Sequence, residues 1–324
     1  MQFNWVLILI VGGAIIFLAV IISLREKSIS ETSDSISAAN SLHYILANNA
    51  LGYESAGSAS AKKSKISFEC NQYSVDGASK NIKDFILFSP NIIDSDKILI
   101  AKLDWELPYD VGNFLYLTSP EARYVFIGDS EFARNVFQSA PANIKKDGYT
   151  NARAVQNEGH KDARLIFFGQ EPEMPGSLSY DIKISAVKVS GDEQSGDLEF
   201  FNFENNDFVS NGKSKYIGMA SLFGAIFSED IGRYECNMEK AFLRLNTVSY
   251  VYLKKSDFIL NEYGKNSNNL CLGLYNNSTS LSDGLKLLSN AKFDKQKIGG
   301  SIIAANDVKK MNEEANALSC ASLY

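Results

Sequence analysis

Residues 124–137 read YVFIGDSEFARNVF, and this stretch decides the fold class. An apolar run at 124–129 predicts a buried strand that ends in a turn. Ser130 then stands where its hydroxyl can accept from the free N–H groups of a helix, and Pro141 ends that helix. A second apolar run follows at 165–168. Strand, helix and strand in this order predict two parallel strands joined by a crossover, so we expect an α/β fold.

Strand and helix signals on both sides of this unit predict a head over residues 66–324. Residues 191–197, GDEQSGD, separate two strand-like runs and predict a hairpin. The last third of the chain has apolar residues at three- and four-residue spacing, which predicts helices. We expect a mixed sheet with a helical carboxyl-terminal third, and an α+β arrangement is the alternative. The other strands are expected at 66–70, 85–88, 98–105, 182–189 and 198–203, and the helices at 217–227, 234–252 and 308–318.

The composition is that of a globular protein, with 45% hydrophobic and 22% charged residues among 324. The net charge is −6, and no Lys/Arg run is interleaved with aromatic residues, so we expect no nucleic-acid partner. Glycine motifs for phosphate or dinucleotides, the HExxH zinc motif and CxxC pairs are missing from the sequence. We therefore expect neither a cofactor nor a metal site.

The amino-terminal segment has the length and composition of a membrane anchor. Residues 5–24 carry no charge and would span about 30 Å as a helix, the thickness of one bilayer core. The basic start, short apolar core and small-residue cleavage site of a secretion signal are missing, so we expect no cleavage. Residues 1–27 are thus expected to be a single-pass anchor in the lipid bilayer. Gly12, Ala19 and Ser23 form a small-residue stripe along it that could seat a second helix.

Two segments are expected to join the anchor to the head. Residues 28–50 carry apolar residues on one helical stripe, which predicts an amphipathic stalk that a partner helix or the head itself covers. His43 falls on this stripe, and we expect it to be packed there rather than to act as a ligand or a base. Residues 51–65 are rich in small and polar residues and predict a flexible linker.

Four widely spaced cysteines predict two disulfides and an oxidising compartment. We favour Cys236 with Cys271, which closes a local loop, and Cys70 with Cys320, which joins the start of the head to its end. The other two pairings stay open, and so do four free buried thiols in a reducing compartment.

Two kinds of sequence signal disagree about the side of the membrane on which the head lies. Arg25 and Lys27 follow the span, and by the positive-inside rule they place the head in the cytoplasm. The cysteines favour the outside, and so do two overlapping glycosylation sequons that begin at Asn276 and Asn277. We expect a cell-membrane protein with an extracytoplasmic head.

Gly128, Asp129 and Ser130 at the end of the strand resemble the first block of the GDS-type, or SGNH, lipases and esterases. The resemblance implies that Ser130 is a nucleophile, and His160, which lies downstream, is then the candidate base. The Asp-x-x-His and Gly-x-Asn-Asp blocks of that family are missing from this chain. A helix cap is the interpretation of Ser130 that we favour.

Residues 105–120, WELPYDVGNFLYLTSP, combine a strand-breaking proline with several aromatic side chains. We favour a corner of the core. The alternative is an aromatic binding surface built on Trp105, Tyr109 and Tyr116.

A long apolar helix that continues as an amphipathic helix before a β-containing head resembles type IV pilins and their archaeal relatives. That family has a short basic leader that ends in Gly, and here Gln2 stands at the start without one. Larger parts of the chain resemble uncharacterised archaeal single-span membrane proteins. The resemblance lies in QFNW at 2–5, WELPYDVGNFLY at 105–116, LFGAIF at 222–227 and YECN at 234–237, and it implies a topology without an activity.

An uncleaved anchor, a stalk, disulfides and the lack of a coherent catalytic set favour a non-enzymatic subunit of the cell surface or envelope. Its partner is expected to be another protein, or further copies of the chain assembled through span and stalk. A pilin-like filament subunit and a membrane-tethered ester hydrolase that uses Ser130 are the alternatives.

Overall fold

The structure is a computed structural model of the 324-residue chain. Among its described residues, no helix combines the length and the apolar character that crossing a bilayer requires. The expected packing stripe of Gly12, Ala19 and Ser23 lies outside the described residues. The described residues are 17, 32–50, 56–156, 159–178, 182–265, 269–277 and 279–324.

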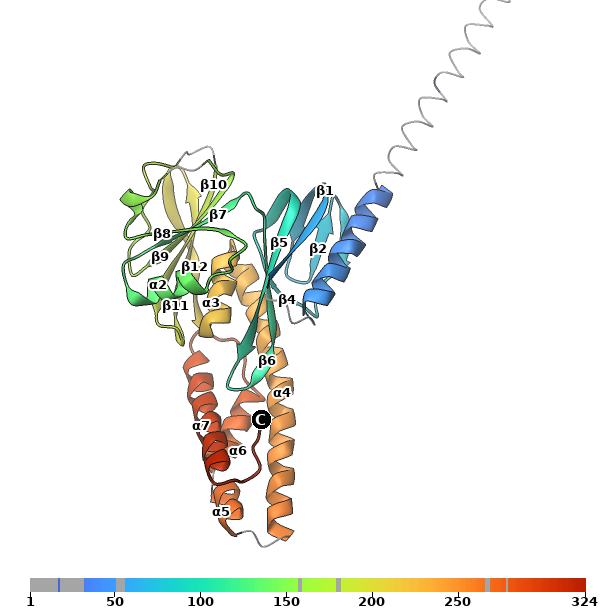
Figure 1. The fold of residues 1–324 in the computed structure, drawn as a ribbon, viewed down its shortest axis with the longest axis vertical. Helices are drawn as coiled ribbons and strands as arrows, with labels where there is room; N and C mark the ends of the chain where they lie inside the picture. Colours follow the sequence, from blue (N-terminus) through green and yellow to red (C-terminus); the bar gives the residue numbers. More distant parts are fainter. Residues whose placement is uncertain are drawn as a thin grey trace, which may run out of the picture.

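Two mixed sheets form the head, as expected for a mixed α/β protein (Figure 1). The first has the order β3-β2-β1-β5-β6-β4, in which β4 and β6 are parallel and the other neighbours are antiparallel. The strands predicted at 85–88 and 98–105 are confirmed, because two strands of this sheet, β4 and β5, cover these residues. The strands of the first sheet are β1 (Ala56–Phe68), β2 (Gln72–Val75), β3 (Ala78–Asn81), β4 (Ile86–Phe88), β5 (Ile92–Glu106) and β6 (Asp110–Thr118).

The second sheet has the order β12-β11-β10-β9-β7-β8. The predicted parallel pair is confirmed, because β7 lies parallel to β9 with Ala122 opposite Asp162. The crossover helix α2 (Glu131–Ser139) leads to β8 on the other side of β7, a polar edge strand that the sequence did not predict. The predicted hairpin is confirmed as β10 and β11. The strands of this sheet are β7 (Ala122–Ile127), β8 (Lys145–Tyr149), β9 (Asp162–Phe168), β10 (Lys183–Gly191), β11 (Ser195–Glu204) and β12 (Asp207–Ile217), and the 3-10 helix η1 (Ala152–Ala154) follows β8.

Helices dominate the last third of the chain, as predicted. α3 (Gly218–Phe227) is almost wholly buried between the two sheets, which its uncharged sequence requires. The first half of α4 (Ile231–Lys265) packs against the first sheet, and its second half extends beyond both sheets and packs with other helices (Figure 1). We call its second half, with α5 (Asn269–Asn277), α6 (Thr279–Leu288) and α7 (Ile298–Ala317), the helical leg.

Three apolar clusters hold these layers together. The largest joins the facing sides of the two sheets to α2, α3 and the helical leg. A second lies on the other face of the first sheet, beneath the helix over residues 32–50. The third lies on the outer face of the second sheet, where the loop segments around Val155 and Leu178 cover it.

The expected stalk is helical over residues 32–50, and the head itself covers its apolar stripe from Ala39 onward, while Ile36 stays exposed. Ala39, Leu42 and Leu46 are buried against the first sheet, and the Tyr73 hydroxyl donates to the Ala39 carbonyl at 2.7 Å. The His43 ring packs edge-on against Phe85, as expected for a packed stripe residue.

The flexible linker expected over residues 51–65 is wrong from Ala56 onward, because this segment forms most of β1. Its backbone pairs with β5, with Ala56 opposite Ala101 and Ser58 opposite Leu99. Gly and Ser predict flexibility when the chain is considered alone. Here the neighbouring apolar strand supplies the hydrogen-bonding partner that holds the segment extended.

Two disulfides are present, but the favoured pairing is wrong. Cys70 is bonded to Cys236 and Cys271 to Cys320, with Cα–Cα distances of 6.0 and 5.7 Å. The first half of α4 packs against the first sheet and therefore brings Cys236 next to the loop that carries Cys70. Cys271 on α5 is then left beside the segment that follows α7.

The aromatic stretch at 105–116 is a core corner, and the alternative of a binding surface is wrong. Trp105, Tyr109 and Tyr116 are all buried. The Trp105 indole donates to the Ile217 carbonyl at 3.0 Å, and the Tyr116 hydroxyl donates to the Ala220 carbonyl at 2.7 Å. These polar atoms fasten β5 and β6 to α3.

Candidate functional site

The Ser130 hydroxyl is the N-cap of α2. It accepts a hydrogen bond from the Ala133 N–H at 3.1 Å, and its backbone is extended, as a cap residue requires. Gly128, two residues earlier, approaches β9 so closely that a Cβ would lie 2.8 Å from the Cβ of Phe168. The Gly-Asp-Ser block is therefore explained by the turn from β7 into α2.

The structure does not bring Ser130 and His160 together. Ser130 follows the carboxyl end of β7, whereas His160 precedes the amino end of the parallel strand β9. The paired stretch from Ala122 to Ile127 separates them by roughly 17 Å at about 3.3 Å per residue. A serine and its general base must lie within hydrogen-bond reach, so this pair cannot act as a nucleophile and base.

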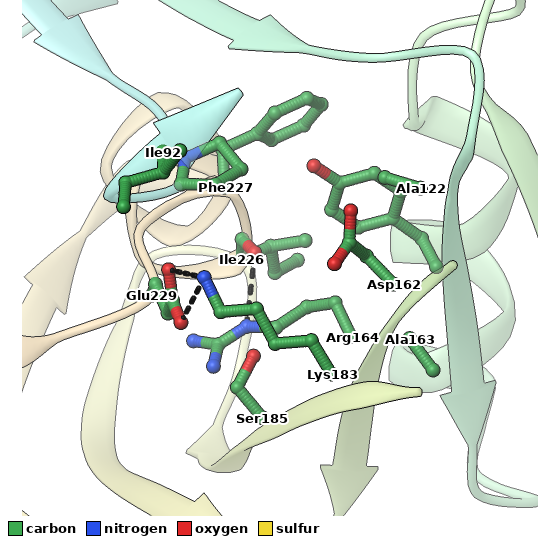
Figure 2. A pocket seen from close by; sticks show the side chains of 12 residues that line it. Ile92, Ala122, Asp162, Ala163, Arg164, Lys183, Ser185, Ile226, Phe227 and Glu229 are labelled. Atoms are coloured by element: carbon green, nitrogen blue, oxygen red, sulfur yellow. Dashed lines mark hydrogen bonds and ion pairs between the residues drawn. The ribbon is translucent and has the colours of Figure 1, made fainter. Parts of the chain in front are cut away.

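A small cavity lies where the amino ends of β7, β9 and β10 meet the carboxyl end of α3 (Figure 2). Its volume is about 40 Å³, which holds a few water molecules at most. Pockets for drug-sized ligands are roughly ten times larger. The charged side chains that line it are Asp162, Arg164, Lys183 and Glu229.

The Arg164 side chain caps the carboxyl end of α3. Its guanidinium donates to the carbonyls of Ala225, Ile226 and Ser228 at 2.6–3.2 Å, and also to Ala186 on β10. These carbonyls are the unpaired acceptors at the end of a helix, where a cation is favourable. Burial lowers the pKa of Arg164 to about 10, so it remains charged at neutral pH.

Lys183 and Glu229 form an ion pair at 2.6 Å across the mouth of the cavity. Glu229 also accepts from the backbone N–H of Asn91 at 3.0 Å and so ties α4's start to the first sheet. The Asp162 carboxylate points into the cavity (Figure 2), and burial raises its pKa, an effect that Lys183 partly offsets. This set of charges ties the two sheets together, and it contains neither a nucleophile with a base nor space for a substrate.

Metal chemistry has no candidate donor set in the described part of the chain, where no three His, Cys, Asp or Glu side chains are grouped to hold an ion. Asn276 and Asn277 lie at the carboxyl end of α5, and their glycosylation stays a prediction.

A more extensive feature is found on α4, which is apolar on two opposite faces. The inner face, which includes Tyr234, Met238, Ala241 and Leu245, is buried, and the sequence predicted it. The other face exposes four large apolar side chains. Leu243, Tyr250, Val251 and Phe258 are 67, 55, 59 and 63% exposed.

These four residues lie on one side of the helix. Leu243 is seven positions from Tyr250, and Val251 is seven positions from Phe258, so each pair is nearly aligned, while the adjacent Tyr250 and Val251 set the width of the row at about 100°. Thr247 and Lys254 lie between them and are also exposed. The Lys254 ammonium lies 5.5 Å from the centre of the Tyr250 ring, so its stem extends the apolar surface. We use the name outer face of α4 for the following six residues: Leu243, Thr247, Tyr250, Val251, Lys254 and Phe258.

The sequence carried the signal for the outer face, although the buried stripe of the same helix concealed it. A helix that needs only one apolar side for its own core should be polar on the other. Isolated exposed apolar residues are common, but a contiguous row of them usually marks an interaction site. The outer face of α4 is therefore the candidate functional site of this molecule.

No family model, curated protein or solved structure matches this chain.

Proposed function

We propose that this protein is a non-enzymatic interaction subunit, anchored in the cell membrane with its head outside the cytoplasm, and that the head docks through the outer face of α4. The observation that carries the proposal is the row of four exposed apolar side chains on a helix whose other side already forms the core. Burying such side chains against a partner is favourable at about 25 cal/mol per Å² of apolar surface.

The proposed location rests on two further observations. Both disulfides lie in the head, and disulfides persist in oxidising compartments. Residues 5–24 have the length and composition of a membrane span. Protease added to intact cells should digest the head. A head that survives until the cells are lysed would contradict the proposed side of the membrane.

Docking is tested by placing a photoreactive phenylalanine analogue at Tyr250 in the full chain and irradiating intact cells. A discrete protein adduct is expected, because Tyr250 lies at the centre of the outer face. The matched control is the same analogue at Ile303, which is 64% exposed on α7, a helix that lies across the helical leg from α4 (Figure 1). Absence of an adduct at Tyr250, or equal labelling at both positions, would contradict the proposed docking face.

A filament subunit is a second candidate that one observation favours. The helix over residues 32–50 packs lengthwise on the first sheet and would continue the apolar segment before it. Electron microscopy of cells with and without the gene tests this candidate. It predicts filaments whose loss follows the loss of the gene, and unchanged surfaces would exclude it.

A further inference from the structure

We propose that the partner at the outer face of α4 is a second copy of this chain, and that the two α4 helices pack antiparallel about a twofold axis near Tyr250 and Val251. This inference rests on the proposed docking face and adds the identity and orientation of the occupant.

The arrangement of residues along the outer face supports a self-complementary contact. Leu243 and Phe258 lie equally far from the midpoint between Tyr250 and Val251, about 11 Å each at 1.5 Å per residue. Thr247 and Lys254 are also placed symmetrically about this point. When the helix direction is reversed, apolar positions therefore fall opposite apolar positions. A twofold dimer requires this property, because the same patch must fit itself.

Charge distinguishes antiparallel from parallel pairing. Lys254 is the one charged residue within the outer face, and its ammonium lies 3.5 Å from the carboxylate of Asp257, beside that face. In a parallel pair in register, the two Lys254 ammonium groups would meet, and like charges placed opposite each other are unfavourable. In the antiparallel pair, each Lys254 lies opposite Thr247 of the other copy. The lysine stem can then cover apolar surface while its ammonium reaches solvent.

The side of α4 that carries the outer face is accessible. α5 and α6 pack on α4 from its inner side, and α7 packs on α6 beyond them (Figure 1). The outer face is about 23 Å long, from Leu243 to Phe258, at 1.5 Å per residue. One helix face of this length is smaller than the ~800 Å² that each partner buries in a standard stable interface. We therefore expect a concentration-dependent dimer.

Single introduced cysteines in the full chain, solubilised in detergent and treated with a short bismaleimide, test the orientation. The native cysteines are all paired, so only the new thiols should react. Val251→Cys should cross-link to itself, because the two copies meet at the axis. Leu243→Cys and Phe258→Cys should not do so alone, since each pair lies about 22 Å apart along the helices, but a mixture of the two should cross-link. Ile303→Cys is the negative control.

A second measurement keeps the result independent of cysteine reactivity. Sedimentation of the full chain should show a dimer that weakens at least about tenfold in Phe258→Glu, because a charge would enter an apolar contact. Ile303→Glu, an equally exposed site on α7, should leave the dimer unchanged. The folded state of each variant is checked by circular dichroism.

Three outcomes would overturn this inference. Cross-linking of Leu243→Cys to itself would indicate parallel pairing. A dimer that Phe258→Glu leaves unchanged would place the contact elsewhere. A chain that stays monomeric at the highest concentration, while Tyr250 still gives an adduct with a different protein in cells, would refute the second copy and leave the proposed docking function standing.

Discussion

The Ser130 hydroxyl holds the first turn of α2, and its loss has a measurable cost. Ser130→Ala removes the acceptor for the Ala133 N–H, and we expect the free energy of unfolding to fall by about 1 kcal/mol. Ser130→Asp keeps an acceptor and adds a negative charge at the helix start, so it should retain the stability. Urea unfolding of the three proteins checks this, and an unchanged midpoint in Ser130→Ala would refute the cap.

The two disulfides differ in how easily a reductant reaches them. Cys271 and Cys320 are buried, whereas Cys70, in the loop between β1 and β2, and Cys236 on α4 are half-buried. Because exchange requires access to sulfur, limited reduction should open the Cys70–Cys236 bond first. Alkylation of the released thiols followed by mass mapping checks the order. Denatured protein, in which both bonds are accessible, is the control, and earlier alkylation of Cys271 would contradict the prediction.

At the level of elements, the helix over residues 32–50 contributes to the stability of the head as an integral layer. Leu46 is fully buried in its cluster beneath the first sheet, and Leu46→Ala should cost about 2–5 kcal/mol. Ile36 lies on the same helix and is 47% exposed, so Ile36→Ala should change stability by less than about 0.5 kcal/mol. Denaturant midpoints of the two variants test the docking. Equal small effects would indicate a helix that is not packed on the head.

Local patterns were sufficient for those elements whose own residues carry the signal. The apolar runs of β7 and β9 and the capped start of α2 predicted a parallel pair, and the hairpin of β10 and β11 followed from its turn residues. β8 and most of β1 were missed, because polar or small residues become strands only through a paired neighbour. β8 forms only beside β7, and most of β1 forms only beside β5. A prediction made from one segment at a time does not take these neighbours into account.

Contacts between segments that are distant in the sequence also decided the features that local patterns did not predict. The pairing of Cys236 with Cys70 depends on the packing of α4 against the first sheet, which loop length alone does not predict. Ser130 and His160 were paired because His160 is the only histidine downstream of the Gly-Asp-Ser block, and the parallel register of β7 and β9 places them at opposite ends of the sheet. The outer face of α4 became visible only once the inner face had been assigned to the core.

Buried tyrosines run through every layer of the molecule, and they predict how the whole fold responds to alkaline pH. Burial raises the pKa of Tyr73 and Tyr124 well above the ordinary value near 10, and it raises the pKa of Tyr275 to about 12. These side chains keep their protons in the folded state at a pH where the unfolded chain loses them. Their contribution to stability is therefore complete below pH 10 and is lost as the pH rises through the folded-state values.

We expect the denaturant midpoint to be steady up to pH 10 and to fall steeply above it, with most tyrosines ionising only as the fold is lost. Tyrosinate absorbance and circular dichroism, followed on the same samples, should change together, and both should recover when the pH is returned to neutral. The Tyr73 hydroxyl donates within the core to the Ala39 carbonyl, and the Tyr124 hydroxyl donates to the Thr118 hydroxyl. Complete tyrosine ionisation near pH 10 with unchanged circular dichroism would contradict the prediction, because it would mean that water already reaches these hydroxyls in the folded protein.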